Sequence, residues 1–162
     1  MRIQYIVSIA LFFPVLLLQT TLVPLVAVDG IAPDLLIILL VFYTISNGQI
    51  FGTILGAVYG FLFDFFTGSL IGSAMMSKLL AGFIAGYFSS ETKRDSYLKP
   101  FNFSLIVFLS ALVNSVIFSF FSALDLNVTI FNLLFNHAFL PAIFTAVIGI
   151  FLIFFYPKRK LF

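Results

Sequence analysis

The chain has 162 residues, of which 62% are hydrophobic and only 9% are charged, and its formal net charge is +2. Soluble domains carry about 25% charged residues, and a soluble fold of this size cannot bury so much apolar surface. The composition therefore excludes a water-soluble domain and predicts an all-α integral membrane protein, with a single transmembrane domain over residues 1–162.

Six apolar stretches are long enough, or nearly so, to cross a membrane as helices. A bilayer core about 30 Å thick needs about 20 helical residues. The predicted helices cover residues 3–25, 34–46, 49–66, 70–88, 101–124 and 130–156. The first is too long for the apolar region of a signal peptide and lacks a clean cleavage site, so we expect it to be retained.

Two of these helices carry internal features that predict their shape. Pro14 and Pro24 predict a bend in the first helix. The second begins at Pro33 or Asp34, where the carboxylate can cap the helix or favour its dipole. Its length, about 13 residues, is short for a span. It is interpreted either as a separate span in a locally thin region or as part of a hairpin that does not quite cross, and two spans are preferred.

The distribution of charge predicts the orientation of the chain. With six spans, Arg2 and the basic residues within 93–99 and 158–160 fall on one side, and the opposite loops contain Asp29 and Asp125 but no Lys or Arg. The positive-inside rule then places both termini in the cytoplasm. The basic segments are expected to contact anionic lipid rather than nucleic acid.

Small residues recur every four positions in the third and fourth predicted helices. The first series comprises Gly48, Gly52, Gly56, Gly60, Asp64, Gly68 and Gly72, and the second comprises Ala74, Lys78, Gly82 and Gly86. Each glycine inside a helix costs about 1 kcal/mol of helix propensity, so the pattern favours close helix packing in a membrane. This packing is expected within the chain or, alternatively, against the helix of a partner.

Asp64 and Lys78 are the two charges nearest the centre of the predicted membrane domain. An unpaired charge there is costly, so we expect an ion pair that holds the third and fourth helices together. The alternatives are that Lys78 extends to the headgroups, or that the two residues form a proton or substrate site.

The remaining candidates predict structure rather than chemistry. Pro141 is expected to kink the last helix and to open a crevice toward the fifth helix. His137, which follows Asn132 and Asn136, is expected to be a hydrogen-bonded interfacial residue, because one histidine without cysteine is a poor metal site. The sequence contains no nucleophile elbow, zinc motif or phosphate loop, so no catalytic, cofactor or metal site is predicted.

Three segments together resemble the MreD family of bacterial rod shape-determining membrane proteins. They are Pro-Asp-Leu-Leu at 33–36, the Gly-Phe-Leu-Phe-Asp run at 60–64 with Gly68 and Gly72 after it, and Pro141 before a basic end. The resemblance covers nearly the whole chain in length and layout. Lys78 is not part of the family pattern.

This resemblance implies a non-enzymatic scaffold of the elongation complex in the bacterial cytoplasmic membrane, with a role in cell shape and peptidoglycan synthesis. The implied partners are an MreC-type periplasmic scaffold protein, MreB filaments, a RodA-type glycosyltransferase and a penicillin-binding transpeptidase. The family also resembles the S components of energy-coupling-factor transporters, which implies a similar six-helix bundle.

A substrate-binding S-type subunit of a vitamin transporter is the alternative function. Such a subunit should present several convergent polar groups at one pocket. The polar candidates are expected to be scattered over different helices, and they are Asp64, Lys78, Asn114, Asn132, Asn136 and His137. This expected scatter favours the scaffold.

Overall fold

The computed structural model describes residues 2–28, 30–122 and 135–155. Its long helices are α1 (Arg2–Thr21), α3 (Leu35–Asn47), α4 (Gln49–Thr67), α5 (Ser73–Gly86), α7 (Pro100–Ser122) and α9 (Leu140–Phe155). Shorter elements are α2 (Val23–Val26), the 3-10 turn η1 (Glu91–Lys93), α6 (Arg94–Tyr97) and the π-helical turn η3 (Phe135–Phe139). Within the described ranges, extended pairing is limited to an isolated bridge between Val28 and Ile31. The predicted all-α class is confirmed.

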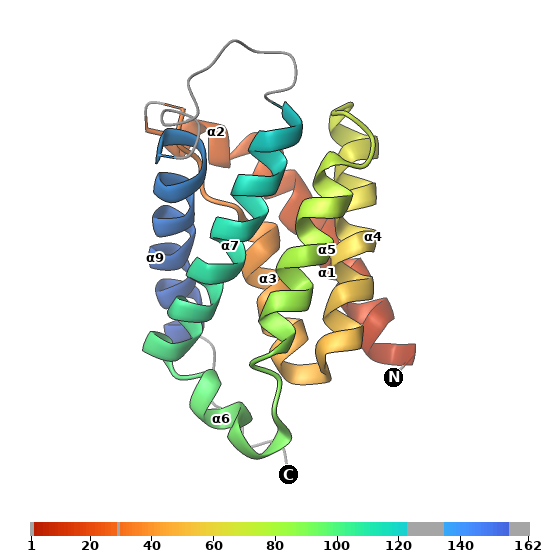
Figure 1. Cartoon of the computed structure of the whole chain (residues 1–162), viewed down its shortest axis with the longest axis vertical. Coiled ribbons are helices and arrows are strands. Elements are labelled where there is room, and N and C mark those ends of the chain that lie inside the picture. The colour runs from red at the N-terminus through yellow and green to blue at the C-terminus, as the bar shows by residue number, and fades with distance from the viewer. Residues whose placement is uncertain (1, 29, 123–134, 156–162) are drawn as a thin grey trace.

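The long helices run alongside one another, with α3 in the middle (Figure 1). Helix α3 packs against α1, α4, α5, α7 and α9, and most of its side chains are buried. Helices α4 and α5 form a tight hairpin, and α7 packs against both α5 and α9. The N-terminus and α6 lie at one end of the bundle, and α2 lies at the opposite end (Figure 1).

The lengths of the helices divide them into two groups. In the described residues, four helices are long and apolar enough to cross a membrane, namely Ile3–Thr21, Gln49–Thr67, Pro100–Phe121 and His137–Phe154. The apolar helices α3 and α5 have 13 and 14 residues. At 1.5 Å per residue these two measure about 20 Å, which is less than the bilayer core of about 30 Å. The count of six spans therefore stays a prediction.

The first predicted helix, 3–25, is interrupted near its end. Helix α1 continues through Pro14 but ends at Thr21, and α2 begins at Val23 with Pro24 in its first turn. Pro24 cannot donate a backbone hydrogen bond to the carbonyl of Thr20, which weakens a helix that would continue through it. Residues 22–26 are thus no longer part of the long helix.

Helix α5 is shorter than the predicted range 70–88 because glycines end the helices on both sides of the preceding turn. Gly68 is left-handed at φ +67° and closes α4 by donating its N–H to the carbonyl of Asp64 at 3.1 Å. Gly72 has φ +104° and stands directly before α5. The predicted last helix, 130–156, begins among residues outside the described ranges, and its described part starts at Phe135.

The two glycine series meet each other inside the chain. A Cβ atom on Gly56 would overlap the carbonyl oxygen of Lys78, and one on Gly60 would overlap that of Ala74. In the other direction, a Cβ on Gly82 would overlap the carbonyl of Gly52. The glycines therefore let the backbones of α4 and α5 touch, as small residues do between membrane helices. Near the start of α4, Gly86 packs on Gln49, and Gly52 packs on Thr44 of α3.

Gly56→Ala should destabilise the protein, because the new methyl group meets backbone rather than a side chain that can rotate away. Overpacking of this kind costs about 1–3 kcal/mol. The matched control is Gly149→Ala in α9, whose Cβ would lie at an ordinary 3.6 Å from Val107. Heating in detergent, followed by size-exclusion chromatography, should show an earlier loss of monodisperse protein for Gly56→Ala alone. If both variants lost monodisperse protein at the same temperature, the close packing of Gly56 on α5 would be contradicted.

Candidate functional site

Asp34 caps the N-terminus of α3 inside the helix bundle. Its Oδ1 accepts a hydrogen bond from the N–H of Ile37 at 3.2 Å. The chain reaches this point from the Val28–Ile31 bridge through the buried Pro33. The start of α3 therefore needs polar partners from the surrounding helices, because its first N–H groups have no partner within the helix.

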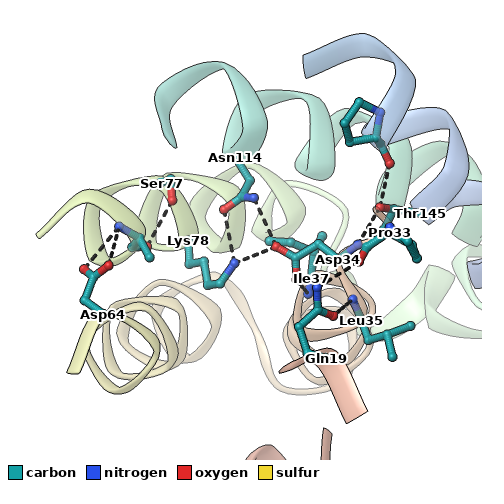
Figure 2. Close-up of polar contacts among 12 residues, drawn as sticks. Gln19, Pro33, Asp34, Leu35, Ile37, Asp64, Ser77, Lys78, Asn114 and Thr145 are labelled. Carbon is teal, nitrogen blue, oxygen red and sulfur yellow. Dashed lines mark hydrogen bonds and ion pairs between the residues drawn. The ribbon is translucent and has the colours of Figure 1, made fainter. Parts of the chain in front are cut away.

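Lys78 of α5 supplies the charge that balances Asp34. Its Nζ lies 2.6 Å from Oδ2 of Asp34, and the Lys78 side chain is only 3% exposed. The ammonium group also donates to Oδ1 of Asn114 at 3.5 Å and lies 5.2 Å from the centre of the Phe63 ring. Figure 2 shows the lysine side chain extending from α5 toward Asp34 and Asn114. The cation thus touches groups from α3, α4 and α7.

Asn114 of α7 binds both members of the ion pair. Its Nδ2 donates to Oδ2 of Asp34 at 3.2 Å, and its Oδ1 accepts from Lys78. The amide is suited to this place because it has donors and an acceptor on one planar group. It closes a three-residue ring of hydrogen bonds with Asp34 and Lys78 (Figure 2).

Two further helices attach to the same helix start. Gln19 of α1 accepts from the N–H of Leu35 at 2.8 Å and donates to the carbonyl of Pro33 at 2.9 Å. Thr145 of α9 accepts from the N–H of Asp34 at 2.9 Å and donates to the carbonyl of Pro141 at 2.7 Å. We call Gln19, Asp34, Lys78, Asn114 and Thr145 the Asp34 cluster. It connects α1, α3, α5, α7 and α9.

The electrostatics of the Asp34 cluster favour a closed, structural arrangement. An ionised side chain alone at the membrane centre costs between about 2.5 and more than 10 kcal/mol, so Lys78 requires its partner. The positive end of the α3 dipole stabilises the Asp34 carboxylate further. The donors and acceptors described above are engaged with one another. In the described residues, two buried side-chain oxygens have no hydrogen-bond partner, Ser46 Oγ and Ser110 Oγ, and neither is in the cluster.

Asp64 forms a separate site at the start of α5. Its two oxygens accept from the N–H groups of Gly72, Ala74 and Met75 at 2.9–3.2 Å. The hydroxyls of Ser69 and Ser73 donate to it at 2.7 and 3.3 Å. The carboxylate is 1% exposed. It therefore acts as a cap supplied by α4 to the neighbouring helix, with a charge that suits the helix dipole.

The expected ion pair between Asp64 and Lys78 is wrong, because Lys78 pairs with Asp34. The four-residue spacing correctly places the backbone of Lys78 against Gly56 of α4. Its long side chain, however, leaves that contact and passes toward α3. Asp34 was assigned only to capping, although a carboxylate has two oxygens and can cap a helix and bind a cation together. The signal available in the sequence is the second carboxylate oxygen of Asp34, for which capping alone supplies no partner.

The signals in the sequence are weaker for the other members of the Asp34 cluster. Gln19 and Asn114 stand out as polar residues in apolar helices, but nothing in the spacing indicates that they meet. The Thr145 hydroxyl could equally have bonded only within its own helix, which is the usual role of threonine there. The convergence depends on how α7 and α9 pack around α3.

Pro141 lies in the first turn of α9, directly after the π-helical turn η3. Because proline has no N–H, the carbonyl of His137 lacks its helical donor, and the Ser119 hydroxyl of α7 donates to it at 3.4 Å. The His137 side chain is exposed. The described residues contain no group of three or more His, Asp or Glu that could hold a metal ion. Asn132 lies outside the described residues.

Comparison with known proteins gave one family match. The family model described as rod shape-determining protein MreD matches residues 1–159. No curated protein and no solved structure matches the chain. The expected likeness to transporter S components therefore stays a prediction.

Asp34→Asn should destabilise the protein strongly, because it leaves the Lys78 cation buried without a carboxylate. Removing one member of a buried ion pair costs about 3–5 kcal/mol. The double variant Asp34→Asn, Lys78→Met should recover most of this loss, since the asparagine can still cap α3 and no charge remains. Thermal melts of the two single variants and the double variant give the coupling energy. The control is Lys99→Met, at an exposed lysine. If the destabilisation of the double variant equalled the sum of those of the single variants, a direct interaction between Asp34 and Lys78 would be contradicted.

Asp64→Ala should reduce accumulation in the membrane more than Asp64→Asn does. The alanine leaves several N–H groups of the first turn of α5 without an acceptor, and each buried unpaired group costs about 1–3 kcal/mol. Asparagine retains one acceptor oxygen, so its effect should be intermediate. Immunoblots of membrane fractions measure the effect, with Asp95→Ala at an exposed carboxylate as control. Wild-type levels of the Asp64→Ala variant would contradict the capping role.

Proposed function

The chain belongs to the MreD family of rod shape-determining membrane proteins, and we propose that it acts there as a non-enzymatic scaffold. Family membership makes it a membrane protein of the rod shape-determining system. In the proposal, the helix bundle binds an MreC-type periplasmic scaffold protein and helps to position wall-synthesis proteins. These are a RodA-type glycosyltransferase, a penicillin-binding transpeptidase and, on the cytoplasmic side, MreB filaments.

The self-contained Asp34 cluster is the observation that supports a scaffold most directly. Its charged and amide groups bind one another, so they act on the arrangement of the helices. A rigid bundle of this kind can present its outer faces to partners in a constant geometry. The faces themselves carry large exposed apolar side chains, among them Phe61, Phe65, Phe101 and Phe151. Such faces suit lipid and partner helices in a bilayer.

The proposed orientation has both termini in the cytoplasm. The N-terminus and α6 lie at the same end of the bundle (Figure 1). The neighbouring lysines Lys93 and Lys99 are exposed at that end. The positive-inside rule favours the cytoplasm for such an end. The MreC-type partner would then approach the opposite end or the flanks of the bundle.

A transport subunit is the second candidate, and one observation favours it. Polar groups that were expected to be scattered partly converge, because Lys78 and Asn114 meet at Asp34. A small-molecule site needs such convergence. Here, however, the converging groups are already paired with one another, and a ligand would have to displace these contacts. The scaffold therefore remains the better account.

The tagged chain, solubilised in mild detergent from rod-shaped cells, should co-purify with an MreC-type protein. Mass spectrometry of the eluate measures this recovery. Recovery of a coupling-factor membrane subunit with its ATPases, and no MreC-type protein, would favour the transport function instead.

The double variant Asp34→Asn, Lys78→Met provides the matched control for this experiment. A scaffold needs the fold but not the two charges, so the variant should still recover the partner and keep cells rod-shaped wherever it accumulates. Microscopy of cells that carry only the variant measures the shape. Loss of rod shape at normal accumulation would contradict a role in which the two charges serve only the fold.

A further inference from the structure

The segment 22–28 exposes apolar side chains at the end of the bundle opposite to the N-terminus. Helix α2 follows α1 after a break at Leu22 and leads the chain over this end of the bundle (Figure 1). Val23 is buried, while Leu25 is 80% exposed. The other large apolar side chains exposed in this segment are Leu22, Val26 and Val28. The sequence has no charged residue between Arg2 and Asp29.

The length of α1 gives the depth of this segment. Its 20 residues rise about 30 Å at 1.5 Å per residue, which is about the thickness of the bilayer core. Contacts with α4 hold α1 along its neighbour, since Tyr5 stacks on Phe51 and Phe12 on Tyr59. The chain that follows Thr21 therefore emerges where acyl chains meet headgroups.

Two opposing requirements keep the segment at this boundary. Its exposed side chains are too apolar for water, since burying such a side chain contributes about 1.5–3 kcal/mol. Its backbone suits the hydrocarbon core poorly, because a single four-residue turn provides few internal hydrogen bonds for its N–H and C=O groups and Pro24 has no N–H to donate. The acyl–headgroup boundary satisfies both, since it offers apolar contact on one side and water on the other.

We propose that residues 22–28 form an in-plane lipid anchor at the acyl–headgroup boundary. The anchor binds the interface of the bilayer itself, through the exposed side chains of Leu22, Leu25, Val26 and Val28. It also limits the depth of the Asp34 cluster. The turn closed by the Val28–Ile31 bridge follows directly, and only Ala32 and Pro33 separate it from Asp34. The anchor and the cluster are thus joined by a short tether. This inference does not depend on the proposed scaffold function.

A tryptophan at position 25 measures the depth directly, because the chain contains no tryptophan. The Leu25→Trp protein is reconstituted in phosphatidylcholine vesicles whose acyl chains carry bromine near the headgroup or near the chain end. Bromine quenches tryptophan fluorescence on contact, so the stronger quencher reports the depth. Leu25→Trp should be quenched more by the shallow bromine. The control Val147→Trp, exposed near the middle of α9, should be quenched more by the deep bromine.

Three other outcomes would contradict the proposed anchor. Stronger quenching of Leu25→Trp by deep bromine means that the segment lies in the hydrocarbon core. Quenching by aqueous iodide with none by either lipid places it in water. Protection from lipid and iodide alike means that a second copy of the chain covers it. If Leu25→Trp is not monodisperse, Val26→Trp, whose side chain is also exposed, takes its place with the same expected result.

Discussion

The ion pair between Lys78 and Asp34 is the interaction on which the arrangement of the helices depends. A bilayer provides no water to solvate a buried ammonium group, so the lysine must be matched wherever α5 is placed. The matching carboxylate belongs to Asp34, the residue that caps α3. Its position also brings together the amide of Asn114 and the backbone contacts of Gln19 and Thr145. One electrostatic requirement therefore connects five helices. Apolar packing alone would leave their relative rotation less well defined, because lipid is as apolar as the helix faces.

Asp34 and Asp64 both cap the start of a short helix inside the bundle. Helices α3 and α5 are the short ones, and the first turn of each is capped by a carboxylate. Asp34 caps its own helix, whereas Asp64 reaches from α4 to the first turn of α5. A helix that starts within a membrane protein has N–H groups that water cannot reach, and an acid satisfies several of them together. Because these short helices begin inside the protein, their first N–H groups need acceptors, and the two acids supply them.

Local features of the sequence predicted more of this structure than long-range ones. Asp34, Gly48 and Gly68 mark ends of α3 and α4 within a residue or two of the predicted bounds, because capping depends on the immediate chain. The glycine series identified the contact between α4 and α5, since consecutive helices joined by a short turn pack together. The partner of Lys78 was missed because periodicity defines a helix face but not which third helix lies beside it. The break before α2 does not follow from the sequence alone, because a proline at this position can either bend a helix or end it.

Lys78 takes part both in the glycine contact between α4 and α5 and in the Asp34 cluster. This double role has a consequence for biosynthesis. Its backbone carbonyl packs on Gly56, while its ammonium group binds an acid 44 residues earlier in the chain. The other contacts of Asp34 join residues 80 and 111 positions apart. Since the ribosome makes the chain from its N-terminus, Asp34 is already in place when the lysine emerges. This ion pair can therefore form within the first half of the nascent protein, and the second half is added around a lysine whose charge is already balanced.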